Sequence, residues 1–156
     1  MSAARPPEGA RTEVRSTEVS SIPGSPHQAI LPEGWPRPKG YANGVLAQGR
    51  TLAIAGMIGW DPQCVFHTDD FGGQARQALQ NIADVLKAAG GDASHIVRMT
   101  WYVTDKRAYL AASREIGQAY REIIGNYTVA MTAVQVSALI EDRAKVEIEV
   151  TAVLPG

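Results

Sequence analysis

The chain has 156 residues, enough for one compact domain, of which 45% are hydrophobic and 20% charged, a normal globular balance. Fifteen Lys and Arg residues against sixteen Asp and Glu residues give a net charge of -1, which argues against a surface built to bind nucleic acid or anionic lipid. The single cysteine excludes an internal disulfide, no apolar run is long enough to span a bilayer, and the N-terminus lacks the apolar core of a secretory signal, so the expected setting is cytoplasmic.

The first part of the chain is rich in proline. Seven of the nine prolines precede residue 39, and the residues between them show little periodic apolar signal. Such a stretch buries too little apolar surface to offset the entropy lost on ordering. We therefore expect residues 1–38 to be a flexible tail and residues 39–156 to form the folded domain.

Regular structure is expected from residue 41 onward. Apolar residues at 45–48 and 51–57 predict two short strands, joined by a hairpin turn at Gly49-Arg50. Residues 58–69 then form a loop with Asp61-Pro62 as its turn signal.

Two amphipathic helices are predicted around a strand. Apolar residues recur at three- and four-residue spacing from position 71 to position 89, after a capping residue at Asp69 or Asp70 and before a glycine pair that ends the helix. Residues 95–103 are rich in β-branched and aromatic side chains, which is typical of a strand. The second helix begins after Thr104 or Asp105 and ends near residue 125.

Two strands, at residues 130–139 and 145–153, close the chain. In the last one, apolar side chains alternate with polar ones, so that the apolar set and the polar set lie on opposite faces; the polar set is Glu147, Glu149 and Thr151. The resulting order is ββαβαββ. Because two helices cover only one face of such a sheet, the predicted fold class is α+β with a mixed sheet.

The uncovered face of the sheet is expected to be partly apolar. Its candidate residues are Ala53, Ala55, Met57, Met131 and Ala133. A solvated face would carry charged residues instead, so we expect another subunit to cover this one.

Standard cofactor and metal motifs are absent from the sequence. There is no Walker loop and no GxGxxG fingerprint, and His27, His67 and His95 do not have the spacing of metal ligands. We therefore expect neither a cofactor nor a metal ion.

Glu147 is the most suggestive titratable residue. A carboxylate in an apolar strand usually faces water, but beneath a neighbouring subunit Glu147 would be partly desolvated and suited to transfer a proton or orient a water molecule. Glu149 lies two residues later on the same face, and the sequence does not choose between the two.

Several segments match one known family in the right order. They are residues 38–45 (PKGYANGV), residues 55–58 (AGMI) followed by Asp61-Pro62, residues 74–82 (QARQALQNI), residues 95–103 with Asp105, and residues 145–150 (KVEIEV). Together they resemble the RidA (YjgF) family of reactive-intermediate deaminases, over about residues 38 to 154.

The resemblance implies a chorismate-mutase-like protomer that assembles as a homotrimer around a central β-barrel, with ligand clefts at the subunit interfaces. It also implies hydrolysis of enamines and imines to ketones and ammonia without a cofactor. In the family an arginine grips the substrate carboxylate and a glutamate positions water.

The family site carries over only in part. The family tyrosine corresponds to Tyr41, the backbone glycine to Gly56 and the strand glutamate to Glu147. The family arginine, the reactive cysteine of some members and the asparagine of the second helix are replaced, in that order, by Met131, Ala133 and Gly117. The remaining substrate-binding positions are expected at Met57, Trp60 and Thr132.

Loss of the arginine changes the expected substrate. One charge-assisted hydrogen bond contributes about 1.5–3 kcal/mol, which is roughly ten- to a hundredfold in affinity. Unless Arg98 or Arg143 takes over from elsewhere, the typical 2-imino acids of the family are poor candidates.

Two main hypotheses follow from the sequence. The first is a cofactor-free hydrolase of a small imine, enamine or related electrophile, in which Glu147 activates water and Tyr41 orients the substrate. The second is a small-molecule-binding trimer that keeps the cleft without the reaction. A ribonuclease is the weakest alternative, because the net charge is close to zero and no basic stripe is present.

Overall fold

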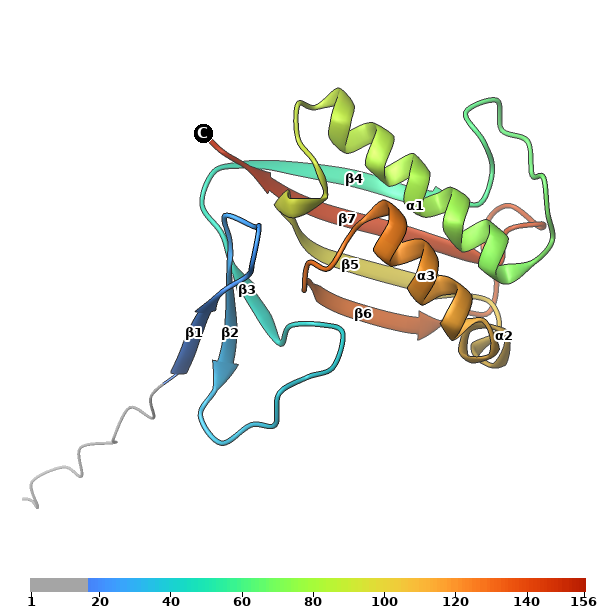
Figure 1. Ribbon diagram of the computed structural model, residues 1–156. Coiled ribbons are helices and arrows are strands. Elements are labelled where there is room, and N and C mark those ends of the chain that lie inside the picture. Colours follow the sequence, from blue (N-terminus) through green and yellow to red (C-terminus); the bar gives the residue numbers. More distant parts are fainter. Residues whose placement is uncertain (1–16) are drawn as a thin grey trace, which may run out of the picture.

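The structure, a computed structural model, describes residues 17–156 and contains a four-stranded mixed sheet (Figure 1). The strands lie in the order β4 (Arg50–Ile58), β7 (Val146–Leu154), β5 (Ile96–Val103) and β6 (Ala130–Gln135). β5 and β6 are parallel, whereas β7 is antiparallel to both of its neighbours. β4 and β6 are therefore the two edges of this sheet.

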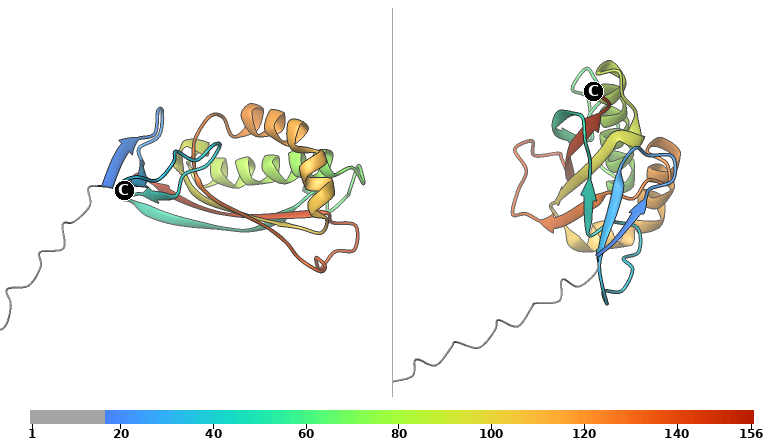
Figure 2. Two further views of the ribbon diagram at one scale, coloured as in Figure 1. Left: turned by 90° about the horizontal axis from the view of Figure 1, so that it is seen from below. Right: turned by 90° about the vertical axis from the view of Figure 1, so that its left-hand side faces the viewer.

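Three helices cover one face of the sheet, and within residues 17–156 the other face carries no helix (Figure 2). They are α1 (Phe71–Ala88), α2 (Lys106–Ala111) and α3 (Ser113–Ile123), and a short 3-10 helix, η1 (Ala93–His95), precedes β5. This arrangement confirms the α+β class. The single second helix expected from the sequence is two helices that meet at Ala112. Within the described part of the chain, no helix is both long and apolar enough to cross a bilayer.

The helix boundaries follow from local capping. The Asp70 carboxylate accepts a hydrogen bond from the backbone N–H of Gly73 at 2.9 Å, which satisfies one of the free donors at the start of α1. Gly90, with a φ of +77°, ends the same helix in the left-handed conformation that glycine adopts without strain. Asp105 caps α2 by accepting from the N–H groups of Arg107 and Ala108.

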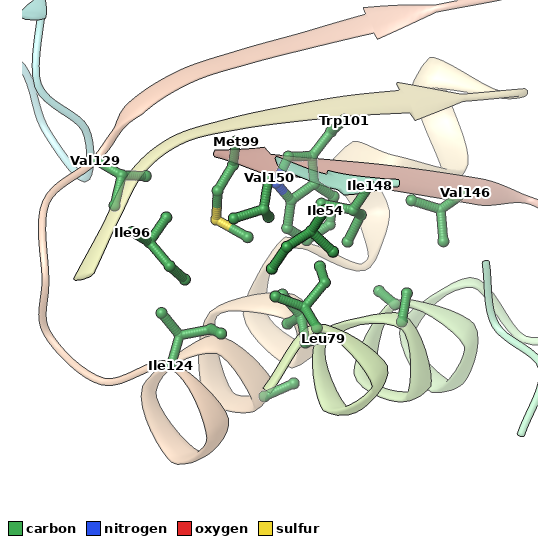
Figure 3. Packing of buried hydrophobic residues seen from close by; sticks show 14 of the residues in the cluster. Ile54, Leu79, Ile96, Met99, Trp101, Ile124, Val129, Val146, Ile148 and Val150 are labelled. Carbon is green, nitrogen blue, oxygen red and sulfur yellow. The ribbon is translucent and has the colours of Figure 1, made fainter. Parts of the chain in front are cut away.

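The core lies between the sheet and α1, with α3 packed alongside (Figure 3). Most of the α1 residues that recur at helical spacing are fully buried, namely Ala75, Ala78, Leu79, Ile82 and Leu86. Across from them, Val146, Ile148 and Val150 of β7 are buried, as the alternation in the sequence predicts. This packing fixes which face of β7 carries Glu147 and Glu149.

A second, three-stranded antiparallel sheet lies beside the domain and consists of β1 (Thr17–Ser21), β2 (Gln28–Pro32) and β3 (Gly44–Leu46). β1 and β2 form where the sequence predicts a flexible tail. His27, in the turn region between them, is only 2% exposed, and its Nε2 lies 3.0 Å from the His95 carbonyl oxygen. The Ser25 hydroxyl donates to the Ser94 carbonyl at 2.7 Å. These long-range contacts, which local composition does not reveal, hold the β1–β2 hairpin on the domain. Residues 1–16, the rest of the predicted flexible tail, lie outside the described residues.

The predicted hairpin between residues 45–48 and 51–57 is wrong. β3 pairs with β2 instead of β4. At Gly49 the chain passes from one sheet to the other with a φ of +146°, and a Cβ there would lie 2.0 Å from the Leu154 carbonyl oxygen. Gly49 is therefore needed because the backbone passes close to the end of β7, and it does not form a two-residue turn.

Candidate functional site

The helix-free face of the four-stranded sheet, here called the open face, carries polar side chains on β7 and β5 and apolar ones on the edge strands, such as Val134, which is 42% exposed and in register with Tyr102. Glu147 and Glu149 of β7 lie in register with Tyr102 and Thr100 of β5. Beside them, Arg98, Thr100 and Glu149 line a recess of about 280 Å³. The face is therefore partly apolar, but Met57 and Met131, which were expected on it, lie elsewhere.

The reason for this error is the register of the two edge strands. Met57 lies opposite Ile148, and Met131 lies opposite Met99, so both methionines pack against the core on the helix side. The expected placement of Ala53 on the open face agrees with the register, which pairs it with Thr151, and Ala55 is exposed within the irregular part of β4, where it has no partner in register. Ala133 lies opposite Trp101 on exposed edge strand β6.

A β-bulge brings Gly56 and Glu147 together on the open face. The pairing of β4 with β7 shifts between Ile54 and Met57, which leaves Ala55 and Gly56 without a partner in register. A Cβ on Gly56 would lie 2.0 Å from the Glu147 Oε1 atom. The absence of a side chain at position 56 thus leaves the space that the carboxylate of Glu147 occupies, beside the irregular part of β4.

The two glutamates of β7 have different surroundings. Glu149 is exposed and accepts a hydrogen bond from the Tyr102 hydroxyl at 2.8 Å, and this bond is the first cause of the raised pKa of Tyr102. Glu147 is half-buried, and its carboxylate has no hydrogen-bond or ion-pair partner among the described residues. Of the two, Glu147 is the carboxylate that is both sheltered and free to act on a bound molecule.

A cavity of about 490 Å³, here called the helix-side pocket, lies between α2, α3 and the start of β6. Gly117 and Met131, which replace the family asparagine and arginine, both line it. Four of its lining residues are aromatic, namely Trp101, Tyr109, Tyr120 and Tyr127. Burial raises the pKa of Tyr120 to about 12, so its phenol stays neutral at physiological pH.

Arg121 also lines the helix-side pocket, and sequence reasoning missed it. Its Nη1 atom lies 3.3 Å from the position that a Cβ on Gly117 would take. The signal that could have found it is the four-residue spacing of Gly117 and Arg121, which places both on one side of α3. Neither arginine considered from the sequence reaches this pocket: Arg98 lies on the open face, and Arg143 donates to Asp69 at 3.0 Å.

The remaining predicted site residues lie apart from these two groups. Tyr41 is 42% exposed beside Ala42, whose N–H donates to the Val129 carbonyl just before β6. Trp60 contacts Phe66 at a ring distance of 5.9 Å and lines a separate recess. Thr132 is exposed in register with Thr100. One protomer therefore brings together Gly56 with Glu147, and Gly117 with Met131, but not the predicted set as a whole.

Metal-ligating side chains do not gather in the described part of the chain: residues 17–156 contain no group of three or more His, Cys, Asp or Glu that could hold an ion.

Comparison with known proteins places the chain among close structural and sequence relatives. The family model described as endoribonuclease L-PSP matches residues 36–154. The human 2-iminobutanoate/2-iminopropanoate deaminase is 32% identical over 114 residues, which cover 72% of this chain and 79% of that protein. A RutC family protein from Pyrococcus horikoshii is 32% identical over 126 residues, which cover 80% of this chain and 96% of that protein.

Solved structures show the same relationship. The crystal structure of the conserved Rid family protein YyfB from Yersinia pestis matches with a TM-score of 0.72 at 32% identity, over 82% of this chain and 98% of that chain. E. coli TdcF, solved with bound serine, matches with a TM-score of 0.58 at 29% identity, over 76% of this chain and 91% of that chain.

Proposed function

The chain belongs to the endoribonuclease L-PSP family, the family of the RidA and YjgF proteins, and from this premise we propose that it hydrolyses a reactive imine or enamine to a ketone and ammonia without a cofactor. The relatives named as 2-iminobutanoate/2-iminopropanoate deaminases support this class of reaction. The observation that carries the proposal within this chain is the unpaired carboxylate of Glu147, packed against Gly56 at a β-bulge.

The proposed reaction uses Glu147 as a general base. The carboxylate takes a proton from a water molecule while the water oxygen bonds to the imine carbon, and the electrons of the C=N bond move to nitrogen. Glu147 returns this proton to the nitrogen, which gives the carbinolamine R₂C(OH)NH₂. The carbinolamine hydroxyl proton then passes to the nitrogen through Glu147, the C–N bond breaks, and ammonia leaves as the carbonyl forms. The sum is R₂C=NH + H₂O → R₂C=O + NH₃, and Glu147 ends unprotonated. The backbone groups of the bulge at Gly56, and the exposed phenol of Tyr41, are proposed to orient the substrate.

The site is proposed to form between copies of the chain in a homotrimer. Glu147 lies on the open face, whereas Gly117 and Met131 line a pocket on the helix side of the sheet. A small substrate cannot contact both groups in one protomer because the sheet lies between them. A second copy that presents its open face to the helix-side pocket would complete the cleft, and the partners needed are then only the substrate and further copies of this chain.

The substrate is proposed to differ from a short 2-imino acid. At the position of the family arginine, Met131 packs against the core and offers no charge to a carboxylate. Loss of one charge-assisted hydrogen bond weakens binding roughly ten- to a hundredfold. We therefore expect 2-iminobutanoate to be hydrolysed poorly compared with larger imines, and Met131→Arg to improve its hydrolysis.

A comparison of two glutamate variants tests the proposal. Wild type, Glu147→Gln and Glu149→Gln are assayed on a panel of imines generated in situ, with ammonia release as the readout. General base catalysis typically contributes 10²–10⁴-fold, so we expect Glu147→Gln to lose at least about a hundredfold in kcat. Glu149→Gln, on the same strand and face, should retain most activity and serves as the matched control.

The outcomes separate the two main hypotheses. If the wild type never exceeds Glu147→Gln on any imine but still binds small molecules, the chain is a non-catalytic binding protein and the hydrolase proposal is wrong. Light scattering on the purified protein tests the assembly, because a monomer at the concentrations that support activity would contradict an intersubunit site.

A further inference from the structure

The helix-side pocket contains one charged side chain, that of Arg121. Glu122, its acidic neighbour in sequence, uses its two carboxylate oxygens for Arg76 at 2.7 Å and Gln118 at 2.9 Å. Among the described residues, no hydrogen bond or ion pair involves the Arg121 guanidinium. The exposed Arg121 side chain interacts with Glu122 only electrostatically, through its charge, so its five N–H donors face the pocket without a hydrogen-bond acceptor among residues 17–156.

Gly117 gives this guanidinium its place. Helical side chains point back toward the preceding turn, so Arg121 lies over the residue four positions earlier. The Nη1 atom is 3.3 Å from the ideal Cβ position of Gly117, tighter than an ordinary carbon contact. A longer side chain at position 117 would displace the guanidinium, and the glycine thus leaves the arginine lying along the pocket wall.

The rest of the pocket suits a flat apolar group. Trp101 and Tyr109 form an edge-to-face pair with ring centroids 6.2 Å apart, and Tyr120 and Met131 add further apolar surface. A volume of about 490 Å³ lies within the range of roughly 300–1,000 Å³ found for small-molecule sites. The walls offer far more apolar than polar surface, so the body of a ligand would be desolvated there while its charge meets Arg121.

We infer that the helix-side pocket binds a monocarboxylate with a large, planar apolar body, and that Arg121 holds the carboxylate. A single guanidinium matches a carboxylate in charge and in its paired hydrogen-bond geometry. A phosphate dianion would call for a second cation, and no lysine or other arginine lines this pocket.

The interpretation of this ligand as a substrate rests on the proposed function, since it names the substrate class of the same site. The substrate would be a 2-imino acid with an aryl side chain, with its carboxylate bound by α3 instead of β6. Met131 then forms part of the apolar wall, and the arginine that binds the carboxylate is Arg121 of α3 instead of an arginine on β6.

Binding of stable ligands tests the inference without any turnover. The affinities of 3-phenylpropanoate, 3-phenylpropanamide and propanoate are measured by calorimetry for wild type, Arg121→Gln and Arg114→Gln. Arg114 is an exposed arginine on the same helix that does not line the pocket, so it is the matched control. Thermal melting and circular dichroism confirm that each variant is folded.

We expect the wild type and Arg114→Gln to bind 3-phenylpropanoate at least about tenfold more tightly than the amide, and propanoate more weakly than either. Arg121→Gln should lose the preference for the acid while keeping its affinity for the amide. Equal binding of acid and amide by the wild type, or an unchanged preference in Arg121→Gln, would overturn the inference.

A second variant locates the binding site. Gly117→Leu introduces a side chain into the pocket beside Arg121 and should weaken both the acid and the amide at least about tenfold. Unchanged binding would place the ligand elsewhere and would contradict the inference. If binding follows these expectations while no imine is hydrolysed, only the proposed function fails. If imines are hydrolysed by Glu147 but the acid has no advantage over the amide, only this inference fails.

Discussion

Replacement of Gly56 by alanine tests the contact on which the proposed reaction depends. The new Cβ would lie 2.0 Å from Oε1, 2.7 Å from Cδ and 2.8 Å from Cγ of Glu147. All three atoms belong to a flexible side chain rather than to backbone, and the φ of Gly56 is not in the left-handed region. We therefore expect the backbone to accept alanine and the Glu147 side chain to move.

The expected cost in stability is small, whereas the expected cost in activity is large. Forcing a side chain away from its preferred rotamer costs about 0.5–1.5 kcal/mol, and overpacking in general about 1–3 kcal/mol. For a chain of this size, a loss of about 1–2 kcal/mol lowers the Tm by about 2–8 °C. Misplacement of a reacting group by about 1 Å costs on the order of a hundredfold in rate, so Gly56→Ala should approach Glu147→Gln in kcat.

A double-mutant cycle isolates the contact. The free energies of unfolding are measured by urea denaturation for wild type, Gly56→Ala, Glu147→Ala and the double variant. The cost of Gly56→Ala should nearly vanish in the Glu147→Ala background, because the clashing atoms are gone. Gly44→Ala is the control, since its Cβ would meet Ile30 at an ordinary 3.6 Å. An equal cost of Gly56→Ala in both backgrounds, or full imine hydrolysis by the single variant, would refute the reasoning.

Three further changes test other parts of the structure. Gly59→Ala should lower the free energy of unfolding, measured by urea denaturation, by about 2–3 kcal/mol. The new Cβ would lie 2.7 Å from the Cα and 2.4 Å from the Cβ of Gln74, and the backbone of α1 cannot move away. A loss below about 0.5 kcal/mol would contradict this close approach. Gln74→Leu should lower the free energy of unfolding by about 2–4 kcal/mol in the same measurement. The fully buried side-chain amide of Gln74 donates to two backbone carbonyl groups and accepts from one backbone N–H of neighbouring loops, and leucine would leave all three unsatisfied. An unchanged stability would show that these backbone groups find other partners. The hydrogen bond between His67 and the Asp61 carboxylate, at 2.7 Å, is the first cause of the lowered pKa of Asp61. The stabilising effect of this carboxylate on its loop is therefore present above the ordinary aspartate pKa and is lost as the pH falls through the lowered pKa. In an NMR titration, His67→Ala should raise the pKa of Asp61, and an unchanged midpoint would exclude the pair as its cause.

The sequence by itself determined the elements whose pattern is strong and local. The apolar stripe from residue 71 to residue 89 becomes α1, capped by Asp70, because helical periodicity and a capping side chain act within a few residues. The alternation in β7 fixed the faces of Ile148 and Glu147 because a strand buried on one side tolerates only one assignment. The motifs carried by these elements were enough to indicate the family.

Only the tertiary structure decided what depends on partners far away in the chain. The pairing of β3 with β2, and the packing of Met57 and Met131 against the core, follow from strand register, which edge strands do not reveal in their own sequence. The anchoring of the N-terminal hairpin through His27 likewise depends on residues nearly seventy positions away, near His95.

The candidate site shows the same division. Glu147 and Gly56 could be expected from motifs, but their contact arises from a β-bulge that only the paired strands define. Arg121 lies in an aromatic pocket because α3 packs beside β6 and because Gly117 has no side chain to keep the guanidinium away. Sequence periodicity specifies which side of an element is apolar, whereas the position of a charge within a site depends on which elements the fold brings together.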